Sequence, residues 1–114
     1  MIRVHLLTRV AATAVVGLSL AGTAGSTDAA AAKSFVISMQ ITGFEPATLT
    51  VKAGDRITWI NKDLFPHTAT ADDKTFDSNS VAPAGQWTYV AARPGRHTYT
   101  CTFHPTMKAT ITVR

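Results

Sequence analysis

The chain has 114 residues, a formal net charge of +4 and one cysteine. This length suits one small domain, and a single cysteine excludes an internal disulfide. The lysines and arginines beyond the N-terminal segment occur singly and are interspersed with aspartates, a pattern that argues against a nucleic-acid-binding protein.

The first part of the chain has the pattern of a secretory signal peptide. Two arginines precede an apolar run over residues 10–21, and several alanines follow it. The apolar run is shorter than the about 20 residues that a helix needs to cross a bilayer, so no stable membrane insertion is expected. We predict a signal peptide over residues 1–32, cleaved near Ala30–Ala32, and a periplasmic domain over residues 33–114.

The rest of the chain predicts an all-β domain. Gly and Pro mark turns at Gly54, Gly85 and Pro94-Gly95, and residues 71–83 predict a polar, irregular loop. No stretch has helical periodicity. The stretches rich in β-formers or alternating in polarity are residues 34–41, 48–51, 56–60, 68–70, 86–90, 96–103 and 108–114. Many short strands with such turns predict a small antiparallel Greek-key β-sandwich.

Four potential metal ligands occur in a suggestive spacing near the end of the domain. Cys101, His104 and Met107 follow one another at intervals of three, so one tight loop can bring three donors to one ion. His67 lies in a distant segment, after Pro66. One thiolate and two imidazoles in a trigonal set, with a weak axial thioether, are typical of blue-copper electron-transfer sites. The four residues therefore predict a copper centre.

Other readings of the same residues remain open. Each residue alone is more often an ordinary core or surface residue than a ligand. Zinc is the competing metal, although structural zinc sites make no use of a thioether. A Cys–His cysteine protease is the competing catalytic reading, but it leaves Met107 unexplained. A copper carrier or copper-resistance protein is the alternative to an electron carrier, and it would be expected to contain Met-rich or His-rich segments.

A third histidine of the domain, His97, is predicted to lie in the core. Residues at intervals of two share one face of a strand, so His97, Tyr99 and Cys101 are expected to point inward together. Four residues of strand span about 13 Å. His97 is therefore too far from Cys101 to bind the same ion.

The sequence resembles the cupredoxins, specifically the amicyanin type. Plastocyanin-like, pseudoazurin-like and azurin-like proteins have longer gaps between the last three ligands. The amicyanin type has two residues in each gap, as this chain does. The matching motifs are Gly54-Asp55-x-Ile57-Thr58-Trp59-Ile60-Asn61, Pro66-His67, Pro94-Gly95-x-x-x-Tyr99-x-Cys101 and Cys101-x-x-His104-Pro105-x-Met107.

The resemblance implies a β-sandwich that carries single electrons in the periplasm and is not an enzyme. The implied partners are redox proteins, namely a periplasmic dehydrogenase or a c-type cytochrome, and the implied state is a monomer. Transient docking is expected near His104, with Phe65 and Pro105 around it. Where this chain has Thr68, the family commonly has Asn. Where it has Phe103, amicyanin has Pro. We expect the backbone amides of Thr68 and Phe103 to donate hydrogen bonds to the Cys101 sulfur.

Overall fold

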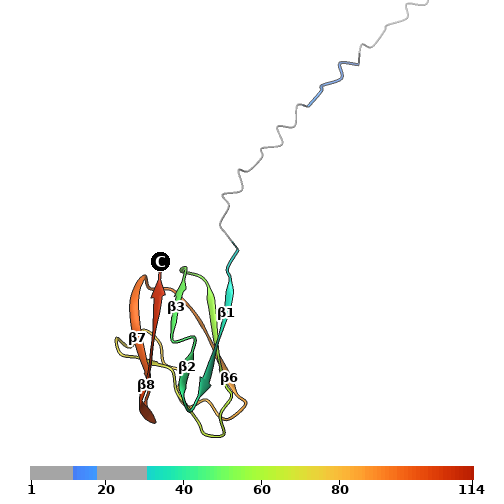
Figure 1. Ribbon diagram of the computed structural model, residues 1–114. Helices are drawn as coiled ribbons and strands as arrows, with labels where there is room; N and C mark the ends of the chain where they lie inside the picture. The colour runs from blue at the N-terminus through green and yellow to red at the C-terminus, as the bar shows by residue number, and fades with distance from the viewer. Residues whose placement is uncertain (1–11, 18–30) are drawn as a thin grey trace, which may run out of the picture.

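The computed structural model describes residues 12–17 and 31–114, and its eight strands form two facing sheets (Figure 1). One sheet has the order β2-β1-β4-β6, and the other has the order β3-β8-β7-β5. The strands are β1 Ser34–Gln40, β2 Gly43–Glu45, β3 Thr48–Val51, β4 Arg56–Asn61, β5 Thr70–Ala71, β6 Gln86–Val90, β7 Gly95–Cys101 and β8 His104–Val113. Within the described residues, no helix is long and apolar enough to cross a membrane.

The predicted β-sandwich is confirmed, but its sheets are mixed rather than wholly antiparallel. β1 pairs with β4 in parallel, and β3 pairs with β8 in parallel, while the other ladders are antiparallel. Parallel neighbours need a long crossover between them. Here the chain leaves β1, contributes β3 to the opposite sheet, and returns as β4. Local strand patterns do not reveal such crossovers, because they depend on which distant strands become neighbours.

The core lies between the sheets and follows the alternation of the strands. In β4, Ile57 and Trp59 are buried while Thr58 and Ile60 are partly exposed. Trp59 packs edge-on against Tyr99 of β7, with the ring centroids 5.6 Å apart, and donates its indole N–H to the Tyr99 hydroxyl. Burial of such aromatic side chains supplies much of the stability of a small domain.

Several strand bounds differ from the sequence prediction: β2 was not predicted, β7 ends at Cys101, and β8 begins at His104 rather than at residue 108. The strand predicted at residues 68–70 is a two-residue strand, β5, which lies one residue further along. The irregular loop predicted at residues 71–83 is confirmed from residue 72 on, although isolated bridges pair His67 with Val81 and Thr70 with Asp77. The predicted signal peptide lies largely outside the described residues.

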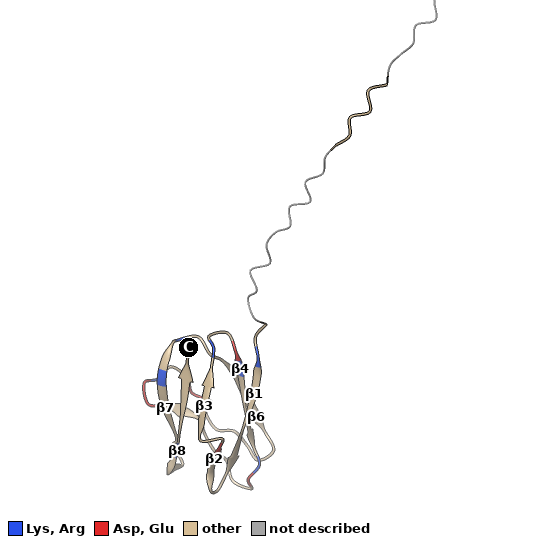
Figure 2. Ribbon diagram, turned by 45° about the horizontal axis from the view of Figure 1, so that its top comes forward, with Lys and Arg blue, Asp and Glu red and all other residues tan. Residues whose placement is uncertain are grey.

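The two ends of the sandwich carry different parts of the chain. The turn between β7 and β8 lies at one end, whereas the C-terminus and the start of β1 lie at the other (Figure 1). Charged residues appear as short, separated stretches of both signs (Figure 2). The dispersed charge agrees with the sequence pattern. The candidate functional site is therefore the group of histidine and cysteine side chains at the end that holds the β7–β8 turn.

Candidate metal centre

A two-residue hairpin turn places the three closely spaced candidate ligands. Thr102 and Phe103 connect β7 to β8, and Cys101 pairs directly with His104 across the turn. Cys101 is fully buried at the end of β7, and His104 is partly exposed at the start of β8. Met107 is buried further along β8. The pairing of β7 with β8 thus fixes the backbone positions of these three residues.

His67 comes from the loop between β4 and β5, and this loop is held by polar contacts. The backbone of His67 exchanges two hydrogen bonds with Val81, with N–O distances of 3.2 and 2.8 Å. The buried amide of Asn61 donates to the carbonyls of Phe65 and Val81, at 2.8 and 2.9 Å. Its oxygen accepts from the backbone N–H of Asp63. Asn61 therefore fastens the part of the loop that precedes His67 and the Val81 segment that pairs with it.

The fold brings three of the four predicted ligands together. Nδ1 of His67 lies 3.6 Å from the Cys101 sulfur, and Nδ1 of His104 lies 3.8 Å from it. The three donor atoms all lie within 4.8 Å of one another, although His67 and Cys101 are 34 residues apart in sequence. His97 stays outside this group, as predicted, on the inward face of β7.

Asp63 orients the His67 ring, a role that the sequence analysis missed. Its carboxylate lies 2.7 Å from Nε2 of His67, and this hydrogen bond lowers the pKa of Asp63. A carboxylate accepts, so Nε2 carries the proton and Nδ1 presents its lone pair towards Cys101. An aspartate four residues before a candidate ligand was a visible signal, but only the loop conformation shows that the two side chains meet.

The chemistry of the donors fits a soft or borderline metal such as copper. One sulfur and two imidazole nitrogens converge, and the buried sulfur accepts a hydrogen bond from the backbone N–H of Thr68 at 3.3 Å. A donor to the sulfur favours the thiolate that a metal requires. Within the described residues, no buried side-chain nitrogen or oxygen lacks a hydrogen-bond partner. The site is thus assembled with its supporting contacts already made.

Comparison with known families agrees with this donor set. A family model described as a cupredoxin-like domain matches residues 10–113. The chain belongs to the cupredoxin family. Copper is accordingly its cofactor.

Two curated relatives of this cupredoxin are plastocyanins. The chain is 36% identical over 72 residues to the chloroplastic plastocyanin of Tetradesmus obliquus, covering 54% of this chain and only 50% of that protein. It is 32% identical over 84 residues to the plastocyanin of Scenedesmus fuscus, covering 62% of this chain and 86% of that protein. The matched part therefore spans half the length of the first relative.

Solved structures show the same fold. A Cu(I) form of an amicyanin variant has a TM-score of 0.66 and 26% identity, covering 74% of this chain and 85% of that one. A purple cupredoxin from Nitrosopumilus maritimus has a TM-score of 0.65 and 24% identity, covering 69% of this chain and 98% of that one.

The cupredoxin ties its two ligand segments together through Thr68. The Thr68 hydroxyl accepts a hydrogen bond from the backbone N–H of Thr102 at 2.9 Å and lies 3.1 Å from the Thr102 hydroxyl. The structure confirms the expected Thr68 amide bond to the Cys101 sulfur. The second expected donor, the amide of Phe103, makes no such bond, and that prediction was wrong. In the tight turn, Phe103 is instead exposed.

Proposed function

We propose that this cupredoxin binds one copper ion through His67, Cys101 and His104, with Met107 as a weak axial donor, and carries single electrons. One observation carries the proposal: three donor atoms from two separate segments lie within 4.8 Å of one another around a buried cysteine. When bound, copper supplies one-electron chemistry between Cu(II) and Cu(I). The function is electron transfer rather than catalysis on a substrate.

The residues around the donors support this function by holding them still. Asp63 fixes the tautomer of His67, Thr68 donates to the Cys101 sulfur, and Asn61 fastens the loop. His67 and Cys101 are fully buried, so water has little access to them. Donors that move little between two oxidation states lower the reorganisation that accompanies electron transfer, and hydrogen bonds to the sulfur tune the potential.

An apolar surface beside His104 supports transient docking of redox partners. Leu64, Phe65 and Phe103 are 86%, 56% and 51% exposed, and they flank the two ligand segments. Pro105 follows His104 and is also exposed. Weak electron-transfer encounters bury small interfaces. We propose that a dehydrogenase or a c-type cytochrome docks here and that His104, the least buried of the three clustered ligands, is the exit point for the electron.

We further propose that the protein is exported and works in the periplasm as a monomer. The basic and apolar pattern of residues 1–32 supports export. An oxidising compartment would expose a free thiol to oxidation. Burial of Cys101 and its use as a ligand both protect it.

Copper titration of the purified protein tests the proposal. We expect one equivalent to produce an intense blue absorption from thiolate-to-copper charge transfer, and voltammetry to show a reversible one-electron wave. Excess zinc should compete for the site and produce no colour. A colourless copper complex, or copper that is released on each reduction, would contradict the electron-carrier function; release on reduction would favour a copper carrier.

A further inference from the structure

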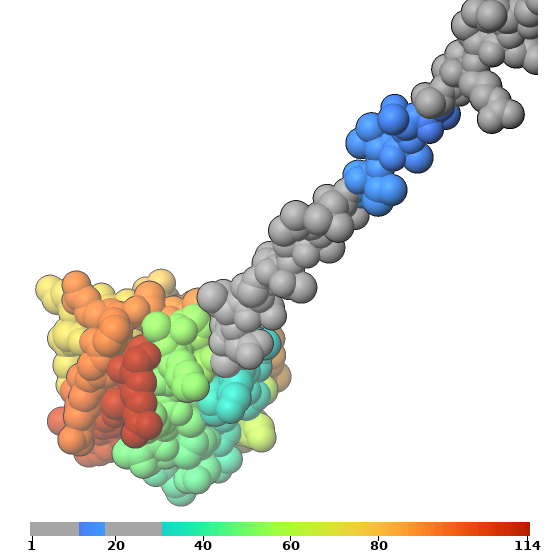
Figure 3. All heavy atoms as spheres, turned by 90° about the horizontal axis from the view of Figure 1, so that it is seen from above, coloured from blue at the N-terminus to red at the C-terminus, as the bar shows by residue number. Residues whose placement is uncertain are grey.

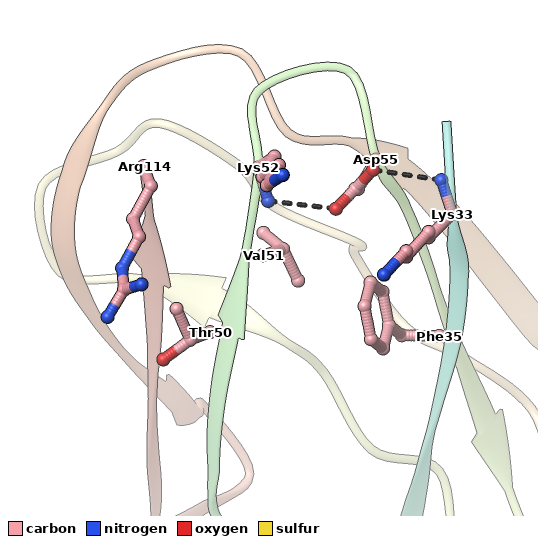
Figure 4. Close-up of a pocket in the computed structure, with 7 residues that line it drawn as sticks. All are labelled: Lys33, Phe35, Thr50, Val51, Lys52, Asp55 and Arg114. Carbon is pink, nitrogen blue, oxygen red and sulfur yellow. Dashed lines mark hydrogen bonds between the residues drawn. The ribbon is translucent and has the colours of Figure 1, made fainter. Parts of the chain in front are cut away.

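Asp55 holds two backbone groups at the end of the sandwich that lies away from the metal centre. It stands just before β4 and is 5% exposed. One carboxylate oxygen accepts from the backbone N–H of Lys33 at 2.9 Å, and the other accepts from the backbone N–H of Lys52 at 2.8 Å (Figure 4). Both oxygens are therefore used to join the entry of β1 to the turn before β4.

Among residues 31–114, Lys33 is the first that forms hydrogen bonds with the sandwich. Besides its N–H bond to Asp55, its carbonyl accepts from the backbone N–H of Arg56 at 2.8 Å. The β1–β4 ladder begins one residue later, at Ser34. Ala31 and Ala32 are exposed and lie outside any strand. The eight strands that the structure describes all lie after Lys33.

The sequence directly before Lys33 is a run of four alanines, Ala29–Ala32. Export peptidases cut after a small residue that follows another small residue two positions earlier. We infer that processing occurs between Ala32 and Lys33 and that the released α-ammonium of Lys33 forms an ion pair with Asp55. The inference rests on the proposed export of the chain.

The chemistry of this step converts a neutral hydrogen bond into a charged one. Water adds across the Ala32–Lys33 amide, the C–N bond breaks, and the products are a carboxylate on Ala32 and an ammonium group on Lys33. The nitrogen already lies 2.9 Å from the Asp55 carboxylate. Charge-assisted hydrogen bonds are shorter and stronger than neutral ones. Processing thus strengthens a contact that the folded chain already makes.

The surroundings identify Asp55 as the partner of the new charge. The pocket in Figure 4 is lined by one carboxylate and three cationic residues, Lys33, Lys52 and Arg114, together with Phe35, Thr50 and Val51. Figure 3 shows this end of the molecule, where the end of β8, β3 and the start of β1 come together. The backbone donors of Lys52 and then Lys33 lower the pKa of Asp55, so it is ionised at neutral pH. Asp55 is the acidic side chain among these lining residues, so it is the group that can pair with the new ammonium.

Intact mass measurement of the protein from a periplasmic extract tests the cleavage site. We expect a chain that begins at Lys33. An exported chain with another N-terminus would overturn the inference and leave the proposed export standing. An uncut chain confined to the cytoplasm would overturn both.

A double-mutant comparison tests the ion pair. The Asp55→Asn substitution is made in a chain that begins at Lys33 and in one that retains Ala31 and Ala32, where the Lys33 nitrogen remains an amide. All proteins are measured without metal, so the result does not depend on copper. We expect Asp55→Asn to shift the unfolding equilibrium about fivefold more in the chain that begins at Lys33, because a charged hydrogen bond contributes more than a neutral one.

A matched substitution provides the control. Asp72→Asn removes a carboxylate that bonds the hydroxyls of Thr98 and Thr100, so its effect should not depend on chain length. Equal effects of Asp55→Asn in the two chains would overturn the ion pair. Should Asp55→Asn prevent folding, acylation of the Lys33 α-amine in the unsubstituted chain decides. Slow acylation relative to a free α-amine supports the pair, and equal rates overturn it.

Discussion

The two segments that supply the donor atoms are organised in different ways. The hairpin that carries Cys101, His104 and Met107 is local, and backbone pairing across a two-residue turn brings Cys101 opposite His104. The loop that carries His67 has no strand of its own. Two backbone hydrogen bonds to Val81 hold it, together with the Asn61 amide and the Asp63 carboxylate. The hairpin brings its ligands together through their spacing in the sequence, whereas the position of His67 also depends on polar side-chain contacts.

This difference teaches where substitutions should act. Hairpin geometry survives the loss of most single side chains, since backbone hydrogen bonds define it. The His67 loop combines two backbone hydrogen bonds to Val81 with polar contacts from the side chains of Asn61 and Asp63. We therefore expect substitutions of residues that hydrogen-bond a ligand to weaken copper binding mainly in the His67 loop, whereas substitution of a ligand should weaken it in either segment.

The largest effect is expected from Cys101→Ser in the hairpin. Serine retains the size of the side chain but removes the thiolate, so the blue colour should vanish. Copper affinity should fall by more than the 10–100-fold typical for loss of an outer-shell contact. Absorption spectroscopy and copper titration measure both. A blue Cys101→Ser variant would refute the assignment of this site.

Asp63→Asn tests the side-chain support of the loop. The carboxylate that accepts from Nε2 of His67 becomes a weaker, neutral partner. We expect copper affinity to fall by about 10–100-fold while the colour remains. Asp77→Asn is the control, because Asp77 accepts hydrogen bonds from the Thr70 hydroxyl and the backbone N–H of Asn79 and contacts no ligand. Equal losses in the two variants would mean that Asp63 does not position His67.

Thr68→Val tests the tie between the two segments. Valine removes the oxygen that accepts from the Thr102 N–H but leaves the Thr68 amide bond to the Cys101 sulfur. Leaving that N–H unpaired should destabilise the fold by about 1–3 kcal/mol. Thr58→Val removes an exposed hydroxyl pair with Thr88 and should cost less. Denaturant unfolding measures the loss of stability in each variant. Equal losses would show that the Thr68–Thr102 contact contributes no more than an exposed hydroxyl pair.

His97 sharpens the comparison, because it shares the inward face of β7 with Cys101 but is not a ligand. Its Nδ1 contacts the Asp73 carboxylate, and its Nε2 lies 2.8 Å from the Arg93 carbonyl. Both partners only accept, so the folded ring carries two protons. Burial opposes this charge, but the hydrogen bonds to Asp73 and to the Arg93 carbonyl outweigh burial and the nearby Arg93 charge, and the pKa of His97 is raised.

The resulting pH dependence has a definite sign. A raised pKa gives a stabilisation that is complete below the unfolded value of about 6.5 and is lost as the pH rises through the folded value. On the acid side, a hydrogen bond from Thr75, supported by one from His97, lowers the pKa of Asp73 to about 2. The stability that ionised Asp73 contributes is therefore lost as the pH falls from 3.8 to about 2.

Unfolding measurements on His97→Gln, from about pH 5 to about pH 9, test this dependence. The unsubstituted protein should lose stability relative to the variant as the pH rises. The copper spectrum should be unchanged in the variant, since His97 lies about 13 Å along the strand from Cys101. Parallel stability curves would show that folding does not raise the pKa of His97.

Some features of this cupredoxin follow from local sequence alone. Short strands and Gly or Pro turns predict an all-β sandwich, and the spacing of Cys101, His104 and Met107 predicts three ligands on one tight loop. The alternation that places His97, Tyr99 and Cys101 on the buried face of β7 also follows from sequence. Each of these depends on contacts between residues near one another in the chain.

Other features depend on contacts between distant segments and needed the tertiary structure. The parallel pairs β1–β4 and β3–β8 arise from crossovers between sheets. The meeting of Asp63 with His67 depends on a loop without strand pairing, and the absence of a Phe103 bond to the sulfur depends on the conformation of a tight turn. Residue types and spacing predict which groups can bind a metal, because ligand chemistry belongs to the side chain. Only the packing of the two sheets decides which loop reaches the buried sulfur and which neighbours orient it.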